Sequence, residues 1–311
     1  MAAPTILVGT QSGLLSFDGA GGKRRAYLDG RRVNAVAPAG PRRLWAVVDG
    51  GEVWRCDDLG DPSWSRAATL DAGLRGTCLA DTRANKPDGI LVGTSEAHLV
   101  RVSGTEATLS DSFEAAPGRR DWFTPWGGPP DVRSISETRD AVFVNIHVGG
   151  ILRSRDRGAS WQPTIDIGAD VHRVVTGGGL VYAAGARGLS VSGDGGDSWR
   201  LLARGLHAAY CRSVAVSGST LLLSASDGPG HGRAALYRSG LDGEHFERCR
   251  DGLPEWFDGN IDSLCVDALP DGSLSAFASE SSQLFTSTDE GSSWNRCAED
   301  LAGVNCVLVL P

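Results

Sequence analysis

Residues 154–161 read Ser-Arg-Asp-Arg-Gly-Ala-Ser-Trp, and residues 192–199 and 287–294 repeat the same pattern, Ser-x-Asp-x-Gly-x-x-Trp. In a tight turn, an Asp side chain accepts hydrogen bonds from backbone N–H groups further along, and Gly supplies a conformation that other residues resist. The Trp then buries a large apolar area. We therefore interpret each copy as a locked corner between two strands, with a structural role for six residues: Asp156, Trp161, Asp194, Trp199, Asp289 and Trp294.

Short apolar runs precede each copy of the pattern. Before the first copy they cover residues 132–135, 141–146 and 150–154, and they are rich in β-branched residues and separated by Gly or Asp. Such runs are typical of β-strands, and no segment with helical periodicity extends beyond a turn or two. Each unit is therefore predicted to hold four short antiparallel strands, with the corner between the third and the fourth.

The number of units follows from their first strands, which we expect to begin near seven polar residues: Asn34, Thr77, Arg133, His172, Arg212, Asp262 and Asn305. Seven units in 311 residues give about 44 residues each, which is the length of a propeller blade. The N-terminal unit lacks a first strand, and residues 305–310 have no strand after them. We expect this C-terminal strand to complete the N-terminal blade and remove the open edges.

The predicted fold is thus all-β: one seven-bladed β-propeller domain over residues 1–311. A six-bladed ring is the alternative, if residues 75–130 are an elaboration and not a blade of their own.

Composition and charge exclude several classes of function. The net charge of −8 and the pI of about 5.3 disfavour binding to nucleic acid, whose phosphates such a surface repels. No apolar run approaches the ~20 residues that span a bilayer, and no secretory signal opens the chain. Its seven Cys are scattered, without a CxxC pair. We therefore expect buried, reduced thiols in a cytoplasmic protein that has neither a nucleic-acid nor a membrane partner.

The Ser-x-Asp-x-Gly-x-x-Trp corner resembles the Asp-box, or BNR repeat, of sialidases and related propellers. This resemblance implies a β-propeller of the sialidase-like superfamily, whose members include hydrolases that act on carbohydrates, receptors and assembly factors. The chain departs from a typical sialidase because it has no Arg-Ile-Pro motif, few Tyr and seven units. Sialic-acid hydrolysis is therefore not expected, and the fold alone does not settle the function.

A ligand site is expected on the face opposite the corners, because loops around a propeller channel carry binding residues. The seven polar residues that open the first strands would ring the channel mouth. A second layer is expected from the turns between second and third strands: Asn145, His147, Arg187, Asp227, His231 and Glu280. Aromatic side chains in nearby loops suit a sugar or another flat polar ligand. The predicted ligand-binding residues are His147, His207, Tyr210, Trp122, Trp126, Trp256, Asn145 and Asp227.

Glycoside hydrolysis is the first hypothesis for the chemistry, and it requires two carboxylates. Asp262 and Glu280 are the candidates, and an Asp262 beside Arg212 would stay ionised as a base or would orient the arginine. The structural alternative is a plain ion pair at the channel mouth. The predicted catalytic set is Asp262, Arg212, Arg133, His172 and Glu280.

Two other hypotheses remain open. A metal-dependent hydrolase or lyase would use His147, His172 and His207, with a carboxylate such as Asp227, although no HxH or HExxH spacing supports it. No cofactor motif is present, so a divalent metal ion is the one cofactor considered. A non-catalytic binding or assembly scaffold would instead present a flat, exposed apolar patch. The sequence carries no signal for the oligomeric state.

Overall fold

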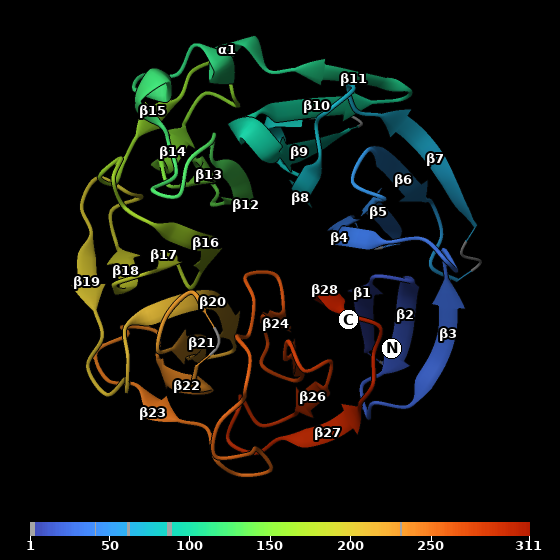
Figure 1. Cartoon of the computed structure of the whole chain (residues 1–311), viewed down its shortest axis with the longest axis vertical. Coiled ribbons are helices and arrows are strands. Elements are labelled where there is room, and N and C mark those ends of the chain that lie inside the picture. Colours follow the sequence, from blue (N-terminus) through green and yellow to red (C-terminus); the bar gives the residue numbers. More distant parts are fainter. Residues whose placement is uncertain (1–3, 41, 61–62, 86–88, 231) are drawn as a thin grey trace.

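Seven four-stranded antiparallel sheets stand around a central axis in the computed structural model, which describes every residue except 1–3, 41, 61–62, 86–88 and 231 (Figure 1). The prediction of a seven-bladed β-propeller is confirmed. The six-bladed alternative is wrong, because residues 76–109 form a complete blade. In each blade the first strand lies nearest the axis and the fourth lies at the rim (Figure 1).

The blades are numbered here from the N-terminus. Blade 1 contains β28 (Val304–Leu310), β1 (Thr5–Thr10), β2 (Gly13–Asp18) and β3 (Lys23–Tyr27). Blade 2 contains β4 (Val33–Ala39), β5 (Arg43–Val48), β6 (Glu52–Cys56) and β7 (Trp64–Thr69). Blade 3 contains β8 (Gly76–Ala80), β9 (Ile90–Thr94), β10 (Leu99–Ser103) and β11 (Glu106–Leu109). Blade 4 contains β12 (Asp131–Glu137), β13 (Val142–His147), β14 (Gly150–Ser154) and β15 (Gln162–Pro163).

The remaining blades follow the same order. Blade 5 contains β16 (Val171–Gly177), β17 (Leu180–Gly185), β18 (Gly188–Ser192) and β19 (Arg200–Leu202). Blade 6 contains β20 (Tyr210–Ser217), β21 (Thr220–Ser226), β22 (Ala234–Gly240) and β23 (Glu247–Arg248). Blade 7 contains β24 (Val266–Ala268), β25 (Ser275–Ala278), β26 (Leu284–Ser287) and β27 (Asn295–Ala298). The short helices are η1 (Arg83–Asn85), η2 (Ser95–Ala97), α1 (Asp111–Glu114) and η3 (Arg119–Asp121).

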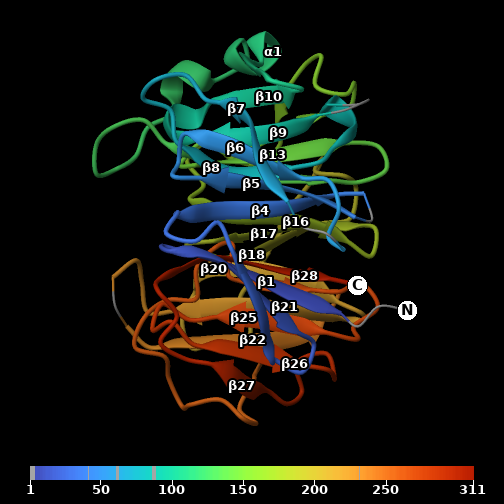
Figure 2. The ribbon, with the colours of Figure 1, turned by 90° about the vertical axis from the view of Figure 1, so that its right-hand side faces the viewer.

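The ring is closed by pairing between the two ends of the chain. β28 pairs antiparallel with β1, and the register runs from Thr5 opposite Leu310 to Thr10 opposite Val304. β1 and β28, the first and last strands of the chain, accordingly lie side by side in both views (Figures 1 and 2). The predicted closure by the C-terminal strand is confirmed, and it leaves neither β1 nor β28 as an unpaired edge.

The core lies between neighbouring blades. Between blades 3 and 4, for example, Leu91 packs with Val132 and Val144, all at most 1% exposed. Space is so tight near the axis that a Cβ added at Gly93 would come within 2.3 Å of Val132 Cγ1. Tight packing between blades fixes their spacing, and therefore the positions of the loops that the blades carry.

The three Ser-x-Asp-x-Gly-x-x-Trp segments form identical hydrogen-bonded turns. Ser154 Oγ donates to Asp156 Oδ1 at 2.8 Å, while Ser160 donates its backbone N–H to Oδ1 at 2.9 Å and its hydroxyl to Oδ2 at 2.6 Å. The turns at Asp194 and Asp289 repeat these bonds. Hydrogen bonds from Ser160 and Ser154 lower the pKa of Asp156 from 3.8 to about 2.

Glycine and tryptophan complete each of these turns. Gly158, Gly196 and Gly291 have φ angles of 83°, 87° and 79°, in the left-handed region that a β-carbon disfavours. The Trp residues directly precede the fourth strands β15, β19 and β27. Trp161 and Trp294 are buried in the core, and Trp199 is partly buried against the cluster between blades 4 and 5.

A β-bulge occurs near the start of six of the seven first strands. In each strand the register against the second strand slips at one of the predicted ring residues: Asn34, Thr77, Arg133, His172, Arg212 and Asn305. A bulge adds a residue that lacks a cross-strand partner and re-aims its side chain. Blade 7 differs, because Cys265 N donates to Asp262 O at 2.9 Å and closes a turn. Its first strand therefore begins at Val266, later than predicted.

Within the described part of the chain, none of the helices has the length and apolar character needed to cross a bilayer.

Candidate functional site

A polar cavity of about 640 Å³ opens at the channel mouth. Six of the seven predicted ring residues line it, and His172 is the exception: Asn34, Thr77, Arg133, Arg212, Asp262 and Asn305. Four Arg and three Asp contribute to its wall. One of these Asp, Asp49, forms an ion pair with Arg31 at 2.5 Å. The charge that remains around the cavity is therefore predominantly positive.

Arg212 is held by neighbouring groups on blades 6 and 7. Its Nη1 donates to Asp262 Oδ1 at 2.5 Å and lies 4.0 Å from Glu280 Oε1. Its Nη2 donates to the carbonyl of Pro229 at 3.3 Å. Burial acts to lower the pKa of Arg212, but the charge and hydrogen bond of Asp262 outweigh it and raise the pKa. The structure thus brings Arg212, Asp262 and Glu280 together as the sequence predicts.

Arg133 differs from Arg212 in its pairing. Among the described residues, its guanidinium takes part in no hydrogen bond and no ion pair, although it lines the same cavity. Burial lowers the pKa of Arg133 despite the nearby charges of Asp262 and Asp131. A partly buried cation without a partner is costly, and an anionic group entering the cavity would offset that cost.

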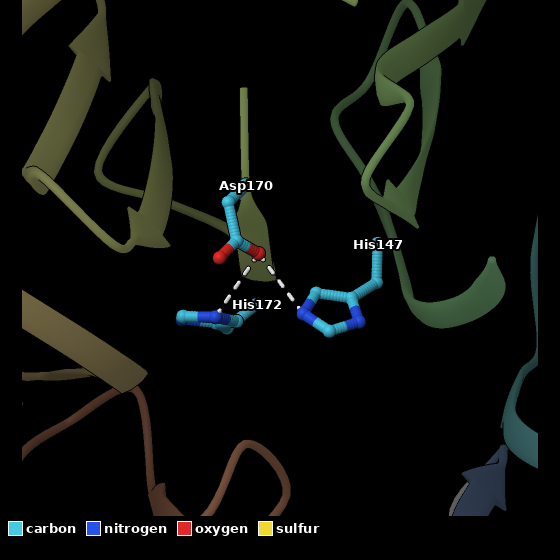
Figure 3. Close-up of side chains that lie close together, drawn as sticks. All are labelled: His147, Asp170 and His172. Atoms are coloured by element: carbon cyan, nitrogen blue, oxygen red, sulfur yellow. Dashed lines mark ion pairs between the residues drawn. The ribbon is translucent and has the colours of Figure 1, made fainter. Parts of the chain in front are cut away.

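A compact group of two histidines and one aspartate lies beside Arg133. His147 ends β13, His172 lies at the bulge of β16, and Asp170 immediately precedes that strand. Asp170 Oδ1 is 2.9 Å from His147 Nε2 and 3.2 Å from His172 Nε2, as Figure 3 shows. His147 and His172 are 5% and 0% exposed, whereas the side chain of Asp170 keeps 26% of its surface open.

The charges of this group are coupled. Burial would raise the pKa of Asp170, but the close imidazoles of His147 and His172 outweigh it and hold the pKa well below 3.8. Burial is also the main reason that the pKa of His147 is lowered, and the charge of Arg133 acts in the same direction. At neutral pH the group therefore offers a carboxylate and at least one neutral imidazole.

Four rings connect this group to the wall of the cavity. The ring centroids of Trp126 and His147 are 5.2 Å apart, those of His147 and His172 are 5.3 Å apart, and those of His172 and Tyr210 are 4.8 Å apart. Trp126 is 65% exposed and borders the outer end of the row. The guanidinium of Arg212 lies 5.7 Å from the Tyr210 ring, at the inner end.

His207 belongs to a separate cluster. Its Nδ1 lies 2.7 Å from the hydroxyl of Tyr237, and its Nε2 lies 3.7 Å from Asp227 Oδ1. The ring of Trp256 is 4.7 Å away, with the guanidinium of Arg248 only 3.7 Å from its centroid. The sequence hypothesis that groups His207 with His147 and His172 is therefore corrected, because Tyr237 and Trp256 hold His207 in its own site.

Besides His147, two predicted ligand residues are buried. Asn145 is 0% exposed, and its Nδ2 donates to the Val171 carbonyl at 2.7 Å, which ties blade 4 to blade 5. Trp122 is 8% exposed and packs in the core beside Phe113, with ring centroids 5.9 Å apart. Both side chains support the site from behind instead of lining it. His231, predicted for the second layer, lies outside the described residues.

Asp170 and Leu264 are two residues that the sequence reasoning missed. Asp170 stands two positions before His172, and this spacing places two side chains on one face of an extended segment, which is a readable signal. Leu264 lines both the mouth cavity and a second cavity of about 650 Å³ deeper in the channel. It packs against apolar clusters of blades 2, 3 and 4. Leu264 thus separates the two cavities, and no pattern in the sequence marks it for that position.

Comparison with known proteins finds similarity in structure only. No protein-family model and no curated protein matches the sequence. An ancestral GH74 enzyme has 15% identity and a TM-score of 0.63. The match covers 90% of this chain but only 37% of the enzyme's chain. YCF48 bound to D1 peptide has 17% identity and a TM-score of 0.57 over 98% of this chain and 88% of its own.

A further similar structure is the extracellular domain of a putative hybrid two-component system from B. thetaiotaomicron. It has 14% identity and a TM-score of 0.60, and the match covers 95% of this chain and 39% of that one. At such identities these likenesses establish the propeller fold alone.

Proposed function

We propose that this propeller binds a small polar ligand, of carbohydrate-like character, through an anionic group at the channel mouth. The observation that carries the proposal is Arg133, which lines a cavity of about 640 Å³ without an ion-pair partner among the described residues. A ligand carboxylate would receive charge-assisted hydrogen bonds from this guanidinium. Asn34, Thr77 and Asn305 offer further polar groups around it.

The surroundings of Arg133 favour a sugar acid over a simple ion. The cavity has space for a ring of several atoms, and its polar wall matches hydroxyl groups. We also propose, from the repeated Ser-x-Asp turns, that the chain belongs to the sialidase-like, BNR-repeat superfamily. The similar structures include both a GH74 enzyme and YCF48 bound to a peptide. They therefore do not decide the class of ligand, and the proposal rests on the cavity itself.

The test is binding of D-glucuronate, with neutral D-glucose as the paired probe, measured by calorimetry and by thermal shift. We expect glucuronate to bind and Arg133→Gln to weaken that binding about 10- to 100-fold, the equivalent of a charged hydrogen-bond pair. Arg200→Gln is the matched control, because Arg200 is an exposed arginine on β19 that pairs with Glu244. Equal binding of both sugars, or equal binding by the Arg133 and Arg200 variants, would contradict the proposal.

Glycoside hydrolysis is a second candidate function for the same cavity. Asp262 and Glu280 both lie within 4.0 Å of one nitrogen of Arg212. The ion pair suits Asp262 to act as a carboxylate base or nucleophile, which leaves Glu280 as the acid. With aryl glucuronides as substrates, Asp262→Asn and Glu280→Gln should each lower kcat about 10²- to 10⁴-fold. Absence of turnover in the wild type would remove this candidate and leave the binding proposal standing.

A non-catalytic scaffold remains the competing interpretation. Four large apolar side chains are exposed in the described chain, and two of them, Phe123 and Trp126, belong to the loop beside His147. This pair is small compared with the apolar patches of typical docking faces. Failure of glucuronate to bind would favour the scaffold.

A further inference from the structure

Three buried side-chain atoms lie close together beside the mouth cavity. His147 Nε2, Asp170 Oδ1 and His172 Nε2 are each buried, and within the described residues none of them has a hydrogen-bond partner. The carboxylate oxygen is close to both nitrogens, yet the bond directions do not meet hydrogen-bond geometry. Buried polar atoms are almost always satisfied, so three unsatisfied atoms in one place call for a ligand.

The spacing of these atoms fits a metal ion. All three lie within 4.8 Å of one another, and Asp170 Oδ1 is 2.9 and 3.2 Å from the two nitrogens. Ligand atoms that share an ion at about 2.0–2.2 Å stand roughly 3 Å apart when they occupy adjacent positions.

Supporting contacts prepare His172 for this role. Its Nδ1 lies 2.7 Å from the carbonyl oxygen of Cys211, to which it donates a hydrogen bond. This bond places the proton on Nδ1 and leaves the lone pair of Nε2 directed at Asp170. The bulge at His172 and the end of β13 at His147 hold both imidazoles on strands of rigid blades. The arrangement shown in Figure 3 is therefore set by the fold.

We propose that His147, Asp170 and His172 form a binding site for one divalent first-row transition metal ion, of the zinc and cobalt type. Two imidazoles and one carboxylate are ligands that such ions prefer, and three protein ligands leave a position for water or substrate. The side chain of Asp170 is 26% exposed, so the group is open to solvent on one side. The proposal goes beyond ligand binding at Arg133, because none of the three residues lines the mouth cavity.

The first experiment is titration of the chelator-treated protein with CoCl₂, followed by absorption spectroscopy and elemental analysis after desalting. We expect about one equivalent of cobalt, with a weak visible spectrum typical of nitrogen and oxygen ligands. Asp170→Asn and His147→Gln should each bind cobalt at least tenfold more weakly. Equal affinity in these variants and the wild type, or an intense thiolate band that assigns the metal to cysteines, would overturn the proposal.

His207→Gln is the matched control, since His207 also faces a carboxylate, Asp227, but lies in a separate cluster. It should bind cobalt like the wild type. Paramagnetic broadening provides a measurement that needs no variant: substoichiometric cobalt should broaden the imidazole NMR signals of His147 and His172 before that of His207. Broadening of all histidine signals alike, or less than half an equivalent of cobalt in the wild type, would also overturn the site. Neither readout uses glucuronate, so the metal site is tested independently of the proposed ligand binding.

Discussion

Arg212 in blade 6 and Asp262 in blade 7 are joined across a blade boundary by a hydrogen bond of 2.5 Å between Nη1 and Oδ1. Arg133 in blade 4 lines the same cavity without such a bond among the described residues. Asp262 raises the pKa of Arg212 against the effect of burial, whereas burial lowers the pKa of Arg133. Two arginines at equivalent bulges therefore have different roles: Arg212 ties two blades together, and Arg133 faces an incoming ligand.

The tie between Arg212 and Asp262 should be measurable in a double-mutant cycle. We expect Arg212→Gln to lower the free energy of unfolding by about 1–2 kcal/mol, because the Arg212 side chain is only 17% exposed and forms a charge-assisted bond. Asp262 is 44% exposed, so solvent screening should limit the coupling energy to about 1 kcal/mol. Urea unfolding of the two single variants and the double variant gives this value. If the losses of the two single variants simply add in the double variant, Arg212 and Asp262 do not stabilise each other.

Removal of the Arg133 charge should have the opposite effect on stability. Arg133→Gln breaks no ion pair among the described residues and removes a charge whose burial is unfavourable. We expect the free energy of unfolding to stay the same or rise by about 1 kcal/mol, while ligand binding weakens. Urea unfolding checks the prediction. A loss as large as that of Arg212→Gln would mean that Arg133 has a structural partner.

Much of the fold is predictable from the sequence because the information is local and repeated. The turns at Asp156, Asp194 and Asp289 each depend on hydrogen bonds within a few residues, so their pattern is visible in the chain. The count of seven first strands and the closure by β28 follow from the same repeat. The sequence predicts Asp262 at the start of a strand, but Asp262 lies in a turn closed by the hydrogen bond from Cys265 N to Asp262 O. The local sequence does not reveal this bond.

The candidate site was less predictable because it depends on contacts between blades. The ring at the mouth was located, but the bulges that re-aim its side chains appear only in the cross-strand register. His147 and His172 meet through Asp170, and His207 is held elsewhere by Tyr237. Trp122 was expected on the ligand wall, but packing against Phe113 places it in the core. Aromatic residues in loops are thus ambiguous until their neighbours are known.

Leu264 should act as a partition and not as an ordinary core residue. It lines both cavities and is only partly buried, so Leu264→Ala removes fewer contacts than truncation in the core. We expect a loss of about 1–2 kcal/mol in the free energy of unfolding, compared with about 2–5 kcal/mol for Leu236→Ala, at a fully buried position of β22. Urea unfolding of both variants tests this difference. Equal losses would show that Leu264 is part of the core.

The Ser-x-Asp turns should make the stability of the fold sensitive to acid. Hydrogen bonds from Ser160 and Ser154 lower the pKa of Asp156 to about 2, from 3.8 for an unperturbed group. As the pH falls through this interval, the unfolded chain takes up protons before the folded chain does, so stability is present above about pH 4 and is lost toward pH 2. Asp156→Asn removes this titration together with the bond to the Ser160 hydroxyl.

We therefore expect Asp156→Asn to lower the Tm near neutral pH and to flatten the dependence of Tm on pH between about pH 4 and pH 2. The difference in Tm between wild type and variant should be largest above about pH 4 and should shrink toward pH 2. Scanning calorimetry over this range measures it, with Asp140→Asn, at an exposed position of the β12–β13 hairpin, as the control. A constant difference in Tm at every pH would show that the turn depends on the shape of the Asp156 side chain and not on its charge.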